Sequence, residues 1–209
     1  MKNAQLVIIG ASGFGAEAAW VLSRMSDAPR LVGFYDDDPQ KSSGEFCGVP
    51  LLGSLENAAG SPVFYHCAVG NNEARKKITA RADALGWTPF SIIDPTAVVA
   101  PDVALGCGIF LGVHVAISCG ARIGSHVITN HNAVIGHNAR VDDYVHICPG
   151  AKISGFCRVE EGAFLATNAT VIPGCAVGAW ASVGAGASVL RDLPSGARLI
   201  PAVGKVMID

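Results

Sequence analysis

The chain has 209 residues, of which 50% are hydrophobic and 15% are charged, and its formal net charge at pH 7 is −2. This near-neutral balance argues against binding to nucleic acid or to an anionic membrane, and no apolar stretch is long enough to span a bilayer. The opening residues lead directly into a predicted strand, so no signal segment is expected. The seven cysteines contain no C-x-x-C pair, which is typical of free thiols in a reducing cytoplasm.

The first predicted element is a buried strand over residues 5–9, which is followed at once by the loop Gly10-Ala11-Ser12-Gly13-Phe14-Gly15. A helix then begins that carries Ala18, Val21, Leu22 and Met25 on one side. Glycines allow a phosphate to approach the backbone, and a helix N-terminus offers free N–H groups. The unit therefore predicts a nucleotide site, although a tight turn in any parallel sheet has the same pattern.

The next predicted strand covers residues 31–35 and ends in Asp36-Asp37-Asp38. Dinucleotide-binding folds place the acid that bonds a ribose hydroxyl about twenty residues beyond the glycine loop. The position of these aspartates strengthens the nucleotide hypothesis, while a solvated turn is the alternative.

Residues 41–60 are predicted to be mainly loop, with a short strand near Leu51. A third strand over residues 63–69 ends in Gly70-Asn71-Asn72, and a helix over residues 73–85 follows. The inward face of that helix is predicted to hold Ala74, Ile78, Ala82 and Leu85. Residues 1–91 thus form a small α/β domain with room for one nucleotide.

From Ile93 to Val189 an aliphatic residue recurs at every sixth position, and only Thr129 interrupts the series. Four places after each of these residues stands a second small or β-branched one, such as Ala133 or Ala151. A fixed six-residue repeat predicts a parallel β-helix, here over residues 92–190, with residues 191–209 as a cap or tail.

Three hexads close one triangular coil of eighteen residues, so each residue lies about 4.8 Å from the one eighteen places on. Both inward positions stack in the core, where Cys157 and Cys175 are expected as reduced thiols. Gly, Asn and Asp are expected to turn the corners. The low charge content is explained if neighbouring subunits cover apolar outer walls, so we expect an oligomer.

His137 falls on a corner of this β-helix, with its ring directed outward, and Gly155 lies one coil further on. An imidazole beside an unshielded backbone N–H can deprotonate a nucleophile and hold a developing oxyanion. A corner histidine that bonds a carbonyl is the alternative.

A zinc site between subunits, as in β-helical carbonic anhydrases, is a rival use of the histidines His114, His126, His131, His137 and His146. No two of them stand eighteen residues apart in one column, so no metal is expected.

Several stretches together are similar to one family. They are Gly10 to Gly15, Phe34-Tyr35-Asp36-Asp37, the run from Val69 to Lys77, Val134-Ile135-Gly136-His137 and Ala151-Lys152-Ile153-Ser154-Gly155. Over nearly its whole length the chain resembles the sugar acyltransferases of the NeuD/PglD type. This resemblance implies a Rossmann-like N-terminal domain, a left-handed β-helix and a homotrimer that moves an acetyl group from acetyl-CoA to a nucleotide-linked sugar.

The resemblance also implies roles for individual residues. His137 is the general base, Asn138 stands in the catalytic site where the family usually has an acidic residue, and the Gly155 N–H stabilises the tetrahedral intermediate. Acetyl-CoA contacts are implied for His146, Lys152, Gly155 and Ala166. Contacts to the nucleotide sugar are implied for Gly10, Ser12, Gly13, Phe14, Asp36, Asp37, Gly70 and Asn71.

Three features depart from the family pattern. Asn138 replaces an acidic residue, and an amide can orient the imidazole but cannot stabilise its positive charge. Phe14 stands where many relatives carry histidine, so the identity of the sugar does not carry over. The tail from Ile200 to Lys205 is spaced differently, which puts the contacts to the CoA adenine in doubt.

The helix start Gly70-Asn71-Asn72-Glu73 is most similar to the branch that acetylates amines. The sequence therefore predicts direct N-acetylation of a nucleotide-linked 4-amino-sugar without a covalent enzyme intermediate. O-acetylation of a sugar of the sialic-acid type is the nearest alternative. A non-catalytic β-helical binding protein is another, and Asn138 is the argument for it.

Overall fold

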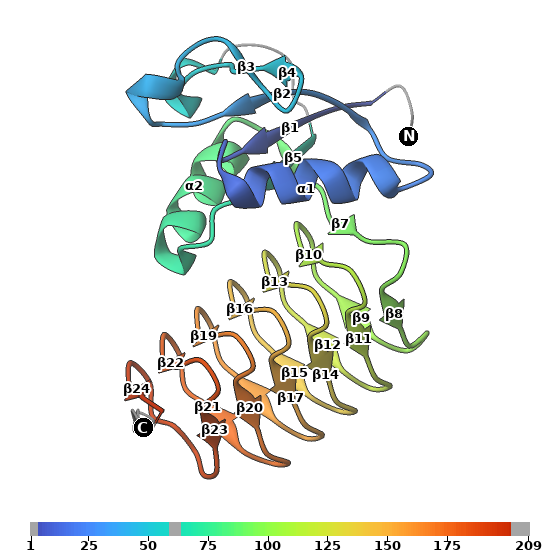
Figure 1. Ribbon diagram of the computed structural model, residues 1–209, viewed down its shortest axis with the longest axis vertical. Helices are drawn as coiled ribbons and strands as arrows, with labels where there is room; N and C mark the ends of the chain where they lie inside the picture. The colour runs from blue at the N-terminus through green and yellow to red at the C-terminus, as the bar shows by residue number, and fades with distance from the viewer. Residues whose placement is uncertain (1–3, 59–63, 202–209) are drawn as a thin grey trace, which may run out of the picture.

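The computed structural model describes residues 4–58 and 64–201, and it shows an α/β part beside a β-helix (Figure 1). The α/β part has a parallel sheet in the order β2-β1-β5-β6. Its strands are β1 (Gln5–Ile9), β2 (Arg30–Tyr35), β5 (Phe64–Cys67) and β6 (Thr88–Pro89), with helices α1 (Gly13–Arg24) and α2 (Asn72–Ala84). A hairpin of β3 (Glu45–Phe46) and β4 (Val49–Pro50) and two 3-10 turns, Pro39–Lys41 and Leu55–Asn57, complete it.

Two details of α2 differ from the prediction. The helix begins one residue earlier, at Asn72, and its buried residues are Asn72, Arg75, Thr79 and Ala82. Leu85, expected to face inward, is 41% exposed. The apolar pattern misled here because α2 packs against the β-helix as well as the sheet, and the contact with the β-helix is polar.

Three parallel sheets of two-residue strands form the walls of the β-helix. The docking face, which lies beside α1 and α2 in Figure 1, holds β7 (Ile92–Ile93), β10 (Phe110–Leu111), β13 (Ile128–Thr129), β16 (His146–Ile147), β19 (Phe164–Leu165), β22 (Ser182–Val183) and β24 (Arg198–Leu199). The second face holds β8 (Val98–Val99), β11 (Ala116–Ile117), β14 (Val134–Ile135), β17 (Lys152–Ile153), β20 (Thr170–Val171) and β23 (Ser188–Val189). The third face holds β9 (Ala104–Leu105), β12 (Arg122–Ile123), β15 (Arg140–Val141), β18 (Arg158–Val159) and β21 (Ala176–Val177).

Strand pairing confirms the predicted coil of eighteen residues. Phe110 pairs with Ile92 on one side and with Ile128 on the other, and the same step repeats on all three faces. The final coil is shorter, because Ser182 pairs with Arg198. Parallel pairing therefore continues past Val189, into the segment that the sequence suggested as a tail. Residues 202–209 of that tail lie outside the described residues.

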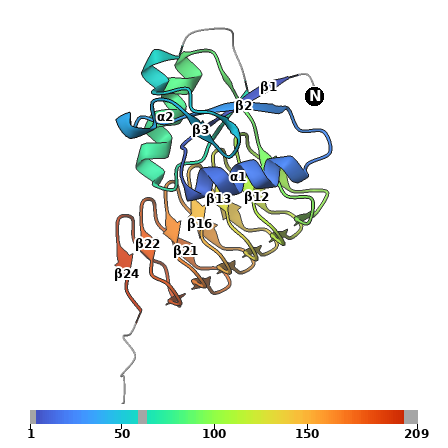
Figure 2. The ribbon, with the colours of Figure 1, turned by 45° about the horizontal axis from the view of Figure 1, so that its top comes forward.

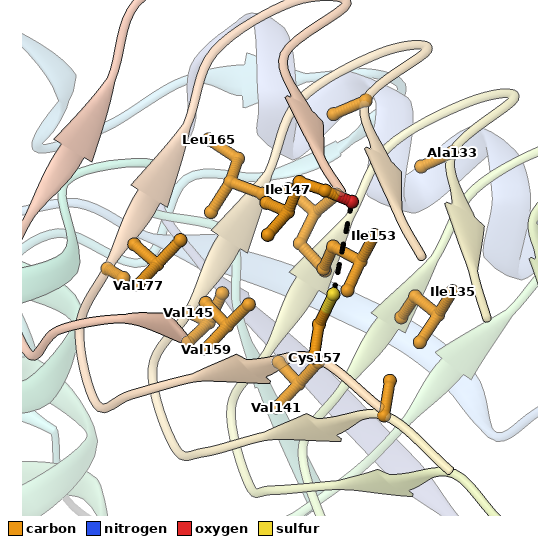
Figure 3. Close-up of a cluster of buried hydrophobic side chains, with 14 of the residues drawn as sticks. Ala133, Ile135, Val141, Val145, Ile147, Ile153, Cys157, Val159, Leu165 and Val177 are labelled. Atoms are coloured by element: carbon orange, nitrogen blue, oxygen red, sulfur yellow. Dashed lines mark hydrogen bonds between the residues drawn. The ribbon is translucent and has the colours of Figure 1, made fainter. Parts of the chain in front are cut away.

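The core of the left-handed β-helix is built from both predicted inward positions, and Figure 3 shows how their side chains interdigitate. Cys157 and Cys175 are buried and free, as expected from their eighteen-residue spacing. Thr129, which interrupts the aliphatic series, is also fully buried. Small residues at the second inward position fit because the triangular interior is narrow.

At every sixth residue from 108 to 186 the backbone is in the left-handed region. Gly and Asn occupy many of these corners, as expected, but His126, Tyr144, Phe156 and Trp180 occupy others, and none of these corners holds Asp. A side chain at such a corner costs about 1–2 kcal/mol in backbone strain. Two of these larger side chains, His126 and Trp180, lie over a glycine one coil earlier, Gly108 and Gly162.

The α/β part is fixed to the docking face by a continuous apolar core, and α1 crosses that face in Figure 2. Ile92, Phe110 and Ile128 of the β-helix join the cluster that contains α1 and the sheet. Polar contacts reinforce the joint: Arg24 pairs with Asp94 at 2.8 Å.

Candidate active site

His137 stands at the corner between the second and third faces, and its side chain is exposed. Its Nδ1 atom lies 3.1 Å from the Oδ1 atom of Asn138. An amide oxygen only accepts hydrogen bonds, so Nδ1 carries the proton and Nε2 keeps a free lone pair. Phe156 packs against the ring edge to face, with 5.0 Å between centroids. The imidazole is therefore held in the tautomer that a general base needs.

The ring lies directly over Gly155. A Cβ atom added at Gly155 would be only 2.5 Å from the Nε2 atom of His137, so any side chain there would displace the ring. The structure thus brings together His137, Asn138 and Gly155 in one place.

The Gly155 N–H is free because of what lies one coil further on. At equivalent corners the N–H of Val113 bonds the side chain of His131 at 2.9 Å, and the N–H of Ser125 bonds that of Asp143 at 2.7 Å. The matching residue for Gly155 is Pro173, which has no acceptor in its side chain. Among the described residues, no protein acceptor receives the Gly155 N–H. This amide can therefore hold an oxyanion.

His146 lies elsewhere, on the docking face beneath the α/β part. Its Nδ1 atom is 3.0 Å from the Gly70 carbonyl oxygen, and its Nε2 atom is 2.8 Å from the Oδ1 atom of Asn130. Burial lowers the pKa of His146 to about 4, so the ring is neutral at pH 7. Within one chain the structure does not bring His146 to His137, because the docking face is opposite the corner of His137.

The glycine loop lies at the carboxyl end of β1. Gly10 has φ 108°, and an added Cβ would be 2.8 Å from the Ala68 carbonyl oxygen, so only glycine fits. Ser12 precedes α1, and its hydroxyl makes no capping hydrogen bond. Gly13 opens the helix with no atom within 4 Å of an added Cβ. Phe14 instead faces the β-helix, where it packs on Phe110 with 5.0 Å between ring centroids.

Two aspartates after β2 are already engaged by protein groups. Asp36 accepts from the Ala11 N–H at 2.8 Å and pairs with Lys41 at 3.0 Å. Burial acts to raise the pKa of Asp36, but these bonds and the Asp38 N–H hold it below its usual value. Asp37 pairs with Arg81 at 2.6 Å, which is the main cause of its lowered pKa. Asp36 therefore stabilises the glycine loop through its hydrogen bond with the Ala11 N–H.

Gly70 and Asn71 follow β5, which pairs with β1, so they lie at the same sheet edge as the glycine loop. The Asn71 side chain caps α2 by accepting from the Ala74 N–H at 2.9 Å.

Lys152 and Ala166 belong to the β-helix. Lys152 is exposed on the second face and donates to the Gly150 carbonyl at 2.9 Å. Ala166 follows β19 at the corner between the docking and second faces.

Three of the other histidines pack against aromatic rings, namely His66, His126 and His131, whereas His114 is exposed at a corner. His131 lies with its Nε2 atom 3.0 Å from Glu17 of α1, and His66 and His126 are buried. Across residues 4–58 and 64–201 no cluster of His, Cys, Asp or Glu could hold a metal ion. In the same part of the chain, no helix has the length and apolar character that crossing a membrane requires.

Sequence reasoning assigned no role to Asn72 and Arg75 of α2. Both are buried and bond successive corner carbonyls of the β-helix. Their spacing in the sequence is the signal that could have revealed this role. Residues three apart on a helix are about 5–6 Å apart, which is close to the distance between successive coils, so both side chains can reach neighbouring coils.

The family model described as the PglD N-terminal domain matches residues 5–82. No curated protein sequence matches the chain. A solved structure of a His-to-Asn mutant of perosamine N-acetyltransferase from Caulobacter crescentus, in complex with CoA and GDP-perosamine, is 32% identical. That similarity covers 99% of this chain and 98% of the other, with a TM-score of 0.87.

The acetyltransferase domain of PglB from Neisseria gonorrhoeae, in complex with acetyl coenzyme A, is 32% identical over 94% of this chain and 95% of its own, with a TM-score of 0.85. WeeI from Acinetobacter baumannii is 25% identical over 94% and 96% of the two chains, with a TM-score of 0.84. With such identity over almost complete lengths, the chain belongs to the sugar acyltransferases of the NeuD/PglD type.

Proposed function

We propose that this acyltransferase moves an acetyl group from acetyl-CoA to the amino group of a nucleotide-linked 4-amino-sugar, with His137 as general base. The observation that carries the proposal is the position of the free Nε2 atom of His137 over Gly155, while Nδ1 is held by Asn138. The similarity to the Caulobacter crescentus enzyme, whose structure contains CoA and GDP-perosamine, supports both substrate classes.

The proposed chemistry is a direct transfer. The sugar amine attacks the thioester carbonyl carbon, a C–N bond forms, and His137 Nε2 removes a proton from the nitrogen. The Gly155 N–H stabilises the negative charge on the carbonyl oxygen of the tetrahedral intermediate. The C–S bond then breaks, and CoA leaves as a thiolate that takes up a proton. Acetyl-CoA itself supplies the activated acyl group.

The proposed acceptor site is the sheet edge of the α/β part. Ser12 and Gly13 offer free N–H groups at the start of α1 to the phosphates of the nucleotide. The Gly10 N–H is bonded to the Tyr35 carbonyl at 2.7 Å, so Gly10 contributes a backbone without a side chain that the phosphates can approach. Gly70 and Asn71 lie beside them at the end of β5. Lys152 and Ala166 are proposed contacts of CoA along the β-helix, and His146 is proposed to lie near the bound substrates.

The active unit is proposed to be a homotrimer, because within one chain the proposed sugar site and His137 lie on opposite sides of the β-helix. The α/β part covers the docking face, whereas His137 is at the opposite corner of the triangular coil. His137 would therefore act on a sugar held by a neighbouring chain. Exposed apolar side chains near that corner, Phe156 at 65% and Val134 at 39%, are consistent with coverage by a neighbour.

The test is release of free CoA thiol from acetyl-CoA in the presence of a panel of nucleotide-linked 4-amino-sugars and their hydroxyl analogues. The proposal expects turnover with an amino-sugar and a loss of about a hundredfold or more in kcat for His137→Ala. His114→Ala, at an exposed corner away from Gly155, is the matched control and keeps wild-type activity.

An unchanged rate for His137→Ala would remove this residue from the mechanism. Turnover with hydroxyl analogues alone would replace N-acetylation by O-acetylation. Absence of turnover with the whole panel, although the nucleotide sugars bind, would favour a binding protein.

A further inference from the structure

Arg75 of α2 has a buried guanidinium that joins the loop after β5 to the β-helix. Its exposure is 1%. Nε donates to the His126 carbonyl at 3.0 Å, and one terminal nitrogen donates to the Tyr144 carbonyl at 2.6 Å. The other terminal nitrogen donates to the carbonyls of Val69 at 2.9 Å and Gly70 at 3.4 Å. One side chain thus contacts both parts of the protein.

The carbonyls on the β-helix side belong to one corner column. His126 and Tyr144 stand one coil apart, and the next corner is Gly162. Asn72 donates to the Gly162 carbonyl at 2.9 Å, and its own oxygen accepts from Arg75 at 3.0 Å. Helix α2 therefore forms hydrogen bonds with three successive corners, which fixes its position along the axis of the β-helix.

The charge of Arg75 is not balanced by an acid. Among the described residues no carboxylate forms a salt bridge with it, and burial lowers its pKa to about 10, so it remains protonated at pH 7. A buried charge held only by carbonyl oxygens is a poor source of stability compared with an apolar side chain. What the guanidinium does provide is a fixed geometry, because its donors lie in one rigid plane.

The loop that Arg75 holds is also held from the other side. His146 lies 3.0 Å from the Gly70 carbonyl oxygen, so this peptide is bonded by two side chains. The next residue, Asn71, caps α2 and is exposed at the sheet edge beside the glycine loop.

We infer that Arg75 is a positioning residue that sets the place of the Gly70–Asn71 loop for the nucleotide sugar by bonding this loop to the corner carbonyls of His126 and Tyr144. The inference rests on the proposed function, in which this loop contacts the acceptor. Arg75 itself touches no substrate. Its effect should therefore fall on the nucleotide sugar and leave acetyl-CoA unaffected.

The test compares Arg75→Lys with the wild-type protein. Lysine keeps the charge and most of the volume, but one ammonium cannot reach carbonyls on both sides of the planar guanidinium. We expect the KM for the nucleotide sugar to rise about tenfold, equivalent to about 1.4 kcal/mol, while the KM for acetyl-CoA stays within about twofold. Lys76→Met is the matched control, because Lys76 also joins α2 to the β-helix, through Glu161, without touching the loop.

Hydrogen exchange over residues 69–73 gives a readout that does not depend on activity. Faster exchange in Arg75→Lys than in Lys76→Met supports the inference even if no sugar of the panel is turned over, an outcome that would count against the proposed function alone. Unchanged exchange in this segment would overturn the inference. Equal rises in both KM values with a lower melting temperature would also overturn it, because they indicate a general structural role.

Discussion

The Oδ1 atom of Asn138 lies 3.1 Å from the Nδ1 atom of His137, at a corner where Asn138 has φ 57°. Asparagine adopts this left-handed conformation more readily than most residues, so the turn and the hydrogen bond come from one side chain. The amide fixes the imidazole tautomer, but in the proposed mechanism it supplies no counter-ion for the positive charge that would develop on the ring during proton transfer.

Removal of the amide should impair the base. We expect Asn138→Ala to lower kcat about tenfold, because the ring loses its orienting hydrogen bond in the transition state. Asn138→Asp should retain or exceed the wild-type kcat, since a carboxylate both orients the ring and stabilises the imidazolium. Asn168→Ala is the control, because Asn168 is at a corner of the same conformation with φ 57°. If Asn138→Ala is as active as that control, the hydrogen bond has no catalytic role.

A methyl group at Gly155 should separate the base from the proposed oxyanion site. The Cβ atom would be 2.5 Å from the Nε2 atom of His137, and the exposed ring can rotate away. We expect Gly155→Ala to lower kcat about a hundredfold, the size expected for a displacement of about 1 Å at a reacting group. The melting temperature should stay near the wild-type value, and a large fall would show that the glycine is needed for folding instead.

The six-residue pattern predicted the β-helix well, because the geometry of each coil is determined by residues that are close together in the sequence. Each hexad determines which residues point inward, and the eighteen-residue coil then places Gly155 beside His137 without further information. The face of α2 was harder to predict, because Asn72 and Arg75 are buried against carbonyl groups of the β-helix. Polar residues that bond backbone atoms far away in sequence leave no periodic apolar signal.

The position of His146 also depended on tertiary structure. The nine residues between it and His137 suggest proximity, but they are half of an eighteen-residue coil, which places the ring on the docking face. The packing of the α/β part on that face then buries it beside Gly70.

Acidification should destabilise the fold through His66. Burial lowers its pKa from 6.5 to about 4, so below pH 6.5 the unfolded chain binds a proton that the folded chain does not. The stabilisation is complete above pH 6.5 and is lost as the pH falls toward 4, by about 3 kcal/mol in total.

Chemical denaturation at pH 7.5 and at pH about 5 measures this loss. His66→Gln should show a smaller difference between the two conditions, because glutamine does not titrate. An equal pH dependence in the two proteins would assign the loss to other groups.

Two glycines of the first loop should differ in what they control. Gly10→Ala places a Cβ atom 2.8 Å from the Ala68 carbonyl in a backbone with φ 108°, so we expect a large loss of stability, more than about 2 kcal/mol. Gly13→Ala meets no atom within 4 Å and should fold as well as the wild type. Yet the new methyl group stands at the helix N-terminus where a phosphate would approach, so the KM for the nucleotide sugar should rise. Melting curves and steady-state kinetics of both variants measure these effects, and an unchanged KM for Gly13→Ala would exclude the glycine loop as the phosphate site.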